Sequence, residues 1–220
     1  MNHQAKMSPW RLSLMAMISS VLLGCASTPG ARPEDMSAQS HEEEATQHAA
    51  ESELHEAKYD PNARGTSPDA VYESDFGFEA TAFNPTEAHN FQAKKHRKHA
   101  DDHLAAAAEL RRAEEDACKS IAPETRSWCP LLGPVVAAEN TPNGVRITVR
   151  EGTDVDALIA RVRCHVAFAN TQGREGMDRC PLYVRGVQVN QSGPSSIELS
   201  VEGKSSIREL QERVADHIGE

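Results

Sequence analysis

The sequence predicts an α+β fold in which a tandem ββα-ββα repeat forms a four-stranded antiparallel sheet with two helices on one face. A long alanine-rich helix and a disordered tether are expected to precede this domain. The main observation is an internal repeat, because shifting the chain by 52 residues aligns 134–166 with 186–218 without a gap. In each unit, apolar residues first alternate with a period of two, as in half-buried strands, and then recur at helical spacing. The residues before position 84 are instead acidic and poor in bulky apolar side chains, which predicts the tether.

The first element of the chain is predicted to be a signal peptide over residues 1–24. Lys6 and Arg11 lie in its basic part, and an apolar run follows over residues 12–24. As a helix this run would rise only about 20 Å, which is too short for the ~30 Å hydrocarbon core of a bilayer. A cleaved signal is therefore favoured over a membrane span.

The signal ends in Leu22-Leu23-Gly24-Cys25, which resembles the lipobox of bacterial lipoproteins. The resemblance implies that Cys25 carries the lipid, with palmitate among its acyl chains, and becomes the first residue of the mature protein. It also implies an outer-membrane anchor that faces the periplasm, because Ala26 and Ser27 lack the aspartate that retains such proteins in the inner membrane. An ordinary secretory signal with an incidental cysteine is the alternative.

Residues 25–84 are predicted to be the lipidated cysteine followed by a disordered acidic tether. Residues 31–80 hold thirteen acidic and three basic side chains, so this segment cannot bury enough apolar surface to offset the entropy of ordering. A transient helix over 38–58 is the only order expected there. The formal net charge of -10 becomes -12 once Lys6 and Arg11 leave with the signal. This charge argues against nucleic acid and anionic lipid as electrostatic partners.

A long helix is predicted over residues 85–120. Asn84-Pro85-Thr86 provides a start signal, an alanine run at 105–108 favours the helix, and Ile121-Ala122-Pro123 ends it. Because such a helix is marginal on its own, we expect it to dock on the domain that follows.

The domain predicted over 121–220 contains the two repeat units. Residues 145–149 and 197–201 alternate between apolar and polar side chains, so each predicts a strand with one buried face. Each unit then continues into an amphipathic helix. The apolar stripes comprise Val155, Leu158, Ile159, Val162 and Val166 in the first helix, and Ile207, Leu210, Val214 and Ile218 in the second.

Cysteine content predicts two disulfides. Removing the lipidated cysteine from the five in the chain leaves Cys118, Cys129, Cys164 and Cys180, an even number in an oxidising compartment. Proximity in the sequence favours Cys118–Cys129 and Cys164–Cys180, and a thiolate metal site is the alternative. Cys164 lies off the apolar stripe of its helix, so either the loop 171–179 or the helix that ends at Cys118 is expected to pack there.

Histidines are the candidate metal ligands. His41, His48 and His55 recur every seven residues, as do His89, His96 and His103. His99 and His103 at i and i+4 are placed to chelate Zn²⁺ or Cu²⁺, with help from His96. The alternative is a solvated helix face within the basic run 94–99, whose positive charge opposes cation binding.

A second histidine pair, His165 and His217, occupies identical positions in the two repeat units. The pair predicts either a shared ligand site across the pseudo-twofold axis or two structural histidines near helix C-termini, where the helix dipole favours them.

No catalytic motif is present in the sequence, which contains no G-x-S-x-G, no H-E-x-x-H and no phosphate-binding glycine loop. Cys164-His165 and Cys180-Pro181-Leu182, taken with the tether and helix, make the chain similar to proteobacterial envelope lipoproteins without an assigned activity. We therefore expect a non-enzymatic interaction or structural module with an envelope-protein partner, attached to the membrane by its N-terminal lipid. The alternative is periplasmic binding or handling of Zn or Cu. We expect no other cofactor, no nucleic acid and no small-molecule substrate.

Overall fold

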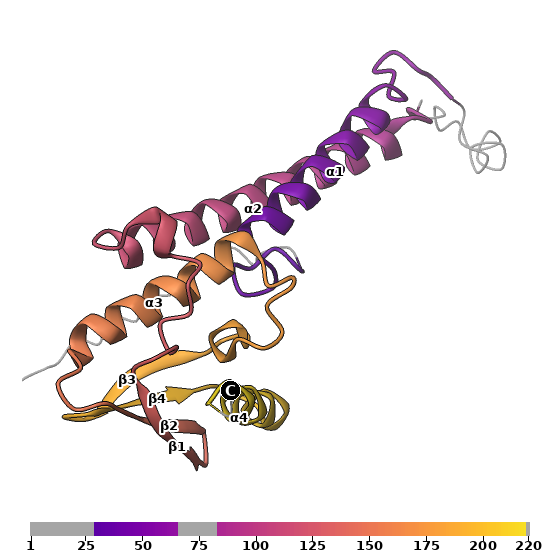
Figure 1. Ribbon diagram of the computed structural model, residues 1–220. Helices are drawn as coiled ribbons and strands as arrows, with labels where there is room; N and C mark the ends of the chain where they lie inside the picture. Colours follow the sequence, from indigo (N-terminus) through magenta and orange to yellow (C-terminus); the bar gives the residue numbers. More distant parts are fainter. Residues whose placement is uncertain (1–28, 66–82, 219–220) are drawn as a thin grey trace, which may run out of the picture.

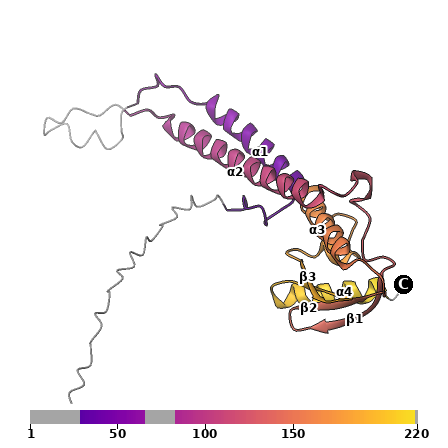
Figure 2. The same ribbon diagram turned by 90° about the vertical axis from the view of Figure 1, so that its left-hand side faces the viewer.

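The computed structural model describes residues 29–65 and 83–218. The predicted signal peptide, its lipobox and Cys25 lie outside the described residues. The described part contains four α-helices, two short 3-10 helices and four strands, and it confirms the predicted α+β class. Among its helices, none combines the length and apolar character that a membrane span requires. A long helical hairpin projects from a sheet-and-helix domain, as both ribbon views show (Figures 1 and 2).

Helices α1 (Ala38–Glu56) and α2 (Glu87–Cys118) form the hairpin and run antiparallel. The long helix predicted over 85–120 is confirmed. The prediction of a disordered tether, in contrast, is wrong for residues 38–56, which form regular helix. The Ser37 side chain caps α1 by accepting a hydrogen bond from the Ser40 backbone N–H. Packing against α2 then supplies the stability that the acidic segment lacks alone.

Strands β1 (Val135–Thr141), β2 (Gly144–Val149), β3 (Gln188–Gly193) and β4 (Ser196–Ser200) form one antiparallel sheet in the order β1-β2-β4-β3. The predicted four-stranded antiparallel sheet is therefore confirmed. Its central register pairs Val145 with Leu199 and Ile147 with Ile197. All four of these side chains are fully buried, so one face of the sheet carries the core.

Helices α3 (Val155–Gln172) and α4 (Lys204–Ile218) supply the other half of the core. α3 starts at Asp154, whose side chain accepts a hydrogen bond from the Ala157 backbone N–H at 3.0 Å. α3 lies against β3 and β4, whereas α4 lies against β1 and β2. A single apolar cluster joins both helices to the sheet, and it includes Val145, Ile147, Leu158, Ile159, Val162, Ile197, Leu199, Leu210 and Val214.

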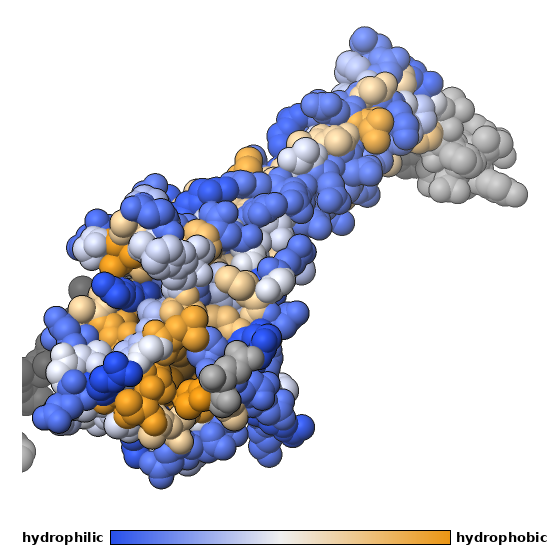
Figure 3. Space-filling model, viewed as in Figure 1, coloured by the Kyte–Doolittle hydropathy of each residue, from blue (hydrophilic) through white to orange (hydrophobic). Residues whose placement is uncertain are grey.

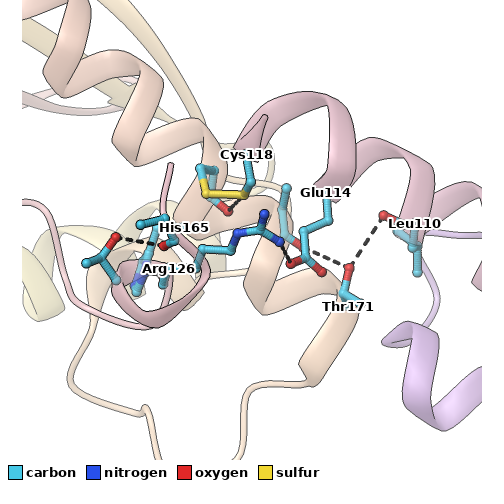
Figure 4. The surroundings of a disulfide bond; sticks show 10 residues. Leu110, Glu114, Cys118, Arg126, His165 and Thr171 are labelled. Carbon is cyan, nitrogen blue, oxygen red and sulfur yellow. Dashed lines mark hydrogen bonds and ion pairs between the residues drawn. A yellow bond between two sulfur atoms is a disulfide. The ribbon is translucent and has the colours of Figure 1, made fainter. Parts of the chain in front are cut away.

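One disulfide, Cys118–Cys164, fastens the end of α2 to the middle of α3 (Figure 4). The predicted pairing of Cys118 with Cys129 and of Cys164 with Cys180 is wrong, because α2 packs along α3 and brings together cysteines 46 residues apart. The off-stripe position of Cys164 is thus covered by α2. Cys129 and Cys180 carry no disulfide, although their sulfur atoms lie 3.7 Å apart.

Polar contacts strengthen the same junction. Arg126 donates to Glu114 at 2.9 Å in a largely buried ion pair, and Thr171 donates from its hydroxyl to the Leu110 carbonyl at 3.4 Å (Figure 4). The hairpin is therefore anchored at its base and free along most of its length.

Candidate metal centre

The two hairpin helices meet through small side chains. We call these residues the small-residue seam: Ala38, Ala45 and Ser52 of α1, and Ala93, Ala100 and Ala107 of α2, all of which are buried. The Ser52 hydroxyl donates to the backbone carbonyl of Ala93 at 2.9 Å, which shows how closely the helix backbones approach. Leu54, Phe91 and Leu104, three of the few bulky apolar residues of the hairpin, are exposed. Leu110 is buried with Ala38 and Ala107 at the base of the hairpin, but large apolar side chains do not fill the space beside the rest of the seam.

Histidines fill that space instead. Each of three cross-helix pairs joins one imidazole of α1 to one of α2 through their Nδ1 atoms. The Nδ1–Nδ1 distances are 2.9 Å for His41–His103, 3.2 Å for His48–His96 and 3.0 Å for His55–His89. The pairs recur because both helices carry histidine every seven residues and the helices run antiparallel. We call these six residues the histidine ladder.

Successive pairs of the ladder also touch one another. The His48 ring stacks on that of His103 with centroids 5.7 Å apart, and the His55 ring stacks on that of His96 at 5.6 Å. His99 adds a seventh ring, edge-on to His48 at 4.8 Å. The imidazoles thus form one continuous row between the helices.

Two carboxylates of α1 complete ligand sets with the ladder. Glu44 joins His48 and His103, and Glu51 joins His55 and His96; within each set the ligand atoms lie within 4.8 Å of one another. The two sets are related by a step of seven residues along α1. Two imidazoles with one carboxylate are a ligand combination that proteins use for Zn²⁺, and imidazole also suits Cu²⁺.

Two imidazoles of the row, His41 and His99, favour the neutral form, which is the form that binds metal. Burial lowers the pKa of His41, and the neighbouring His103 lowers it further. Burial also lowers the pKa of His99, with added contributions from His48 and Lys95.

Two cationic side chains of the basic run 94–98 have acidic partners, which reduces the positive charge that would oppose a cation. Arg97 forms an ion pair with Glu56 of α1, and Lys98 pairs with Asp102 at 2.6 Å. Farther along the hairpin, Arg111 binds both carboxylate oxygens of Glu42 at 2.8 and 2.7 Å.

The residues predicted from the sequence take different partners from those expected. His96, His99 and His103 do not form one triad on α2; His96 and His103 instead belong to different ligand sets with α1. The prediction did not include His48, His55, Glu44 and Glu51, which the structure places beside His103 and His96 in these two sets. The matching seven-residue spacings of the two histidine series were the signal that could have paired them.

His165 and His217 each face a cysteine: His165 Nε2 lies 3.6 Å from Cys180 Sγ, and His217 Nε2 lies 3.3 Å from Cys129 Sγ.

Comparison of the chain with protein-family models, curated proteins and solved structures gives no match. The function is therefore inferred from the residues and their geometry.

Proposed function

We propose that this protein binds divalent transition-metal ions, Zn²⁺ or Cu²⁺, along the histidine ladder of its helical hairpin. The observation that carries the proposal is the set of three cross-helix Nδ1–Nδ1 contacts at 2.9–3.2 Å, in the place where apolar side chains would normally fill a hairpin. Each contact brings together two nitrogen lone pairs from separate helices.

In each ligand set the two histidines come from successive pairs of the ladder, and the ligand atoms lie within 4.8 Å of one another. Two imidazole nitrogens, each about 2.0–2.1 Å from one ion, are separated by about 2.9 Å at a right angle and about 3.3 Å at a tetrahedral angle, so each set would close around its ion. Without an ion, one ring nitrogen of each cross-helix pair donates its hydrogen to the other. Neutral imidazole binds an ion through a nitrogen lone pair, so uptake would exchange these hydrogen bonds for metal bonds while the rings keep one hydrogen each.

The two carboxylate-containing sets define the capacity of the hairpin. Glu44, His48 and His103 hold one ion, and Glu51, His55 and His96 hold a second. Because each ligand set contains residues of both helices, bound metal would cross-link α1 to α2 at two positions along the hairpin. A hairpin that lacks a bulky apolar core gains stability from such links.

The location of this activity is also a proposal. The lipobox at Leu22-Leu23-Gly24-Cys25 supports a lipid anchor in the outer membrane, with the hairpin in the periplasm. There the protein would act without catalysis, by binding or handling metal ions close to the membrane.

We further propose that the sheet-and-helix domain arose from an internal repeat of strand, strand and helix. The sheet register supports this, because Arg146 pairs with Glu198, the residue 52 positions later that occupies the equivalent place in the second unit. Residues equivalent in the sequence thus meet at the centre of the sheet, as a pseudo-twofold axis requires.

Metal titration of residues 26–220, which lack the lipidated cysteine, tests the metal-binding function. Isothermal titration with Zn²⁺ and with Cu²⁺ should show two more ions bound than in the His48→Ala/His55→Ala double variant, which lacks one ligand of each set. Equal stoichiometry in the two proteins would rule out the ladder as the binding site.

A matched pair of carboxylate variants sharpens the test. Glu51→Gln removes a proposed ligand and should weaken binding by ~10-fold or more. Glu53→Gln removes an equal charge at an exposed position of the same helix and should leave affinity unchanged. Equal weakening in both would show a general charge effect rather than ligation.

The second candidate function is the interaction module predicted from the sequence. Trp128 and Leu132 are 70% and 63% exposed, although side chains of this size are usually covered. In the space-filling view, hydrophobic residues gather over the sheet-and-helix domain, whereas the hairpin surface is mostly hydrophilic (Figure 3). A hairpin that binds no metal in the titration would favour this function.

A further inference from the structure

A second group of metal-ligating side chains lies in the sheet-and-helix domain, apart from the hairpin. We call Cys129, His165, Cys180 and His217 the cysteine–histidine cluster. Cys129 follows the 3-10 helix η3 (Pro123–Thr125), and Cys180 directly precedes the 3-10 helix η4 (Pro181–Tyr183). His165 belongs to α3 and His217 to the last turn of α4. Four separate segments therefore bring one potential ligand each.

We propose that this cluster is a Cys₂His₂ site for one Zn²⁺ ion, independent of the hairpin. The ligand atoms of Cys129, His165 and Cys180 all lie within 4.8 Å of one another, and His217 approaches from the side of Cys129. The site takes a borderline soft cation because it offers two sulfur and two nitrogen donors.

Three of the six distances between the ligand atoms can be compared with the edges of a tetrahedron around zinc. With Zn–S near 2.3 Å and Zn–N near 2.0–2.1 Å, tetrahedral edges are about 3.8 Å for sulfur to sulfur and about 3.6 Å for sulfur to nitrogen. The structure has 3.7 Å between the sulfur atoms of Cys129 and Cys180. It has 3.6 Å from Cys180 to His165 and 3.3 Å from Cys129 to His217.

His165 is already oriented as a ligand. Its Nδ1–H donates to the backbone carbonyl of Arg126 at 2.7 Å, which leaves the lone pair of Nε2 on the side of Cys180 Sγ. The side chain is 1% exposed, and its ring rests edge-on against Tyr183 at 5.2 Å. Metal-bound histidines usually have such a carbonyl partner on the other ring nitrogen, because it fixes both tautomer and orientation.

The two thiols differ in acidity. A hydrogen bond from Cys180 lowers the pKa of Cys129 to about 6, although burial acts in the opposite direction. The same hydrogen bond and burial raise the pKa of Cys180. Binding of Zn²⁺ would then form two Zn–S bonds and release the thiol protons to solvent, one from each cysteine that is still protonated, leaving a site with no net charge.

A Cys129–Cys180 disulfide is the competing chemistry. It would withdraw both sulfur atoms from the imidazoles and leave the buried His165 Nε2 without a donor or an ion to bind, which is unfavourable. The two cysteine pairs of the described residues differ in this respect. Cys118 and Cys164 form a disulfide, whereas the sulfur atoms of Cys129 and Cys180 lie 3.7 Å apart with a histidine beside each.

Cobalt substitution tests the site in residues 26–220, which lack the lipidated cysteine, with the Cys118–Cys164 disulfide formed. Co²⁺ should give a sulfur-to-cobalt charge-transfer band, and Zn²⁺ in excess of the two proposed hairpin sites and this site together should remove it. The hairpin contains only nitrogen and oxygen donors, so its cobalt would not give the sulfur band. Absence of that band, or a Cys129–Cys180 disulfide found by peptide mapping, would overturn the proposal.

Variants of single residues test which side chains give the sulfur-to-cobalt band. Cys129→Ser and His217→Ala, both at partly exposed positions, should abolish the band or shift it away from the tetrahedral form while circular dichroism stays unchanged. His48→Ala in the hairpin is the matched control and should retain the full band. A band that survives Cys129→Ser, or that disappears with His48→Ala, would contradict the assignment.

Discussion

His41 shows how burial changes the pKa of a single side chain in this protein. His41 is fully buried between the two helices, and its Nε2 has no hydrogen-bond partner in the structure. Burial and His103 lower its pKa, while Asp35 and the carbonyls of Arg32 and Pro33 act to raise it. An imidazole in this position remains neutral at a pH where an exposed histidine would begin to charge.

This lowered pKa predicts that acid destabilises the hairpin. Between the folded pKa of His41 and its ordinary value of 6.5, the unfolded chain binds more protons than the folded one, so stability rises with pH. The contribution is complete above pH 6.5 and is lost as pH falls toward the folded pKa. We expect metal-free protein to show a lower Tm for loss of helical circular dichroism at pH 5 than at pH 8.

The variant His41→Asn isolates this effect, because it keeps a polar side chain of similar size but does not titrate. Its Tm should change less between the two pH values than that of the wild type. An equal pH dependence in both proteins would mean that other groups control the transition.

Elements in this chain differ in how far the sequence predicts them. The strands at 144–149 and 196–200 follow from their period-two alternation, and α3 follows from its apolar stripe. α1 was predicted only as a transient helix over 38–58, because its buried positions are occupied by small and polar side chains, which give no hydrophobic periodicity. The histidine repeat was visible, but ligand sets that span two helices required knowing that α1 packs against α2.

The cysteines likewise show that local sequence features do not predict contacts between distant residues. Sequence proximity favours short loops, yet the observed Cys118–Cys164 disulfide closes a separation of 46 residues. That link depends on how α2 packs along α3, a tertiary contact that composition and spacing do not encode. The helix that ends at Cys118 was one of the two segments predicted to pack on Cys164.

The Cys118–Cys164 disulfide should contribute strongly to the stability of the junction. In the loop-entropy model, closing a 46-residue separation stabilises the fold by about 4 kcal/mol. The Cys118→Ala/Cys164→Ala double variant should lose roughly that free energy of unfolding in guanidinium titrations. Breaking the link by reduction should match the double variant, and a loss below about 1 kcal/mol would show that packing alone holds α2 to α3.

The small-residue seam predicts a way to disrupt metal binding without touching a ligand. Ala45→Leu places a bulky side chain where the helix backbones approach closely, so α1 and α2 must separate. The histidine pairs would then open beyond the reach of one ion, and Zn²⁺ affinity should fall at least ~10-fold, as for loss of a supporting residue.

Ala50→Leu is the matched control, because Ala50 is exposed on the same helix and leucine is a good helix former. It should bind Zn²⁺ as the wild type does. Unchanged affinity in Ala45→Leu would show that the ladder does not depend on the seam.

At the scale of the whole molecule, charge and architecture act together. The net charge of -10 attracts cations to the surface, and the hairpin extends its ladder away from the domain that carries the apolar core (Figure 1). The domain is held by hydrophobic burial and a disulfide, whereas the hairpin depends on a narrow seam and paired imidazoles. Metal should therefore affect the two parts unequally.

Zinc is expected to stabilise the hairpin much more than the sheet. At free Zn²⁺ 100-fold above Kd, each occupied ladder site adds about 2.7 kcal/mol to the free energy of unfolding, a shift of roughly 5–10 °C in Tm. Hydrogen exchange with and without Zn²⁺ locates the effect: amides of α1 and the first half of α2 should gain protection, while β2 and β4 change little. In the His48→Ala/His55→Ala variant the hairpin protection should disappear, whereas any zinc effect near Cys129 and Cys180 should persist. Protection confined to the cysteine–histidine cluster in the wild type would place all metal binding there and leave the ladder as a structural pairing of histidines.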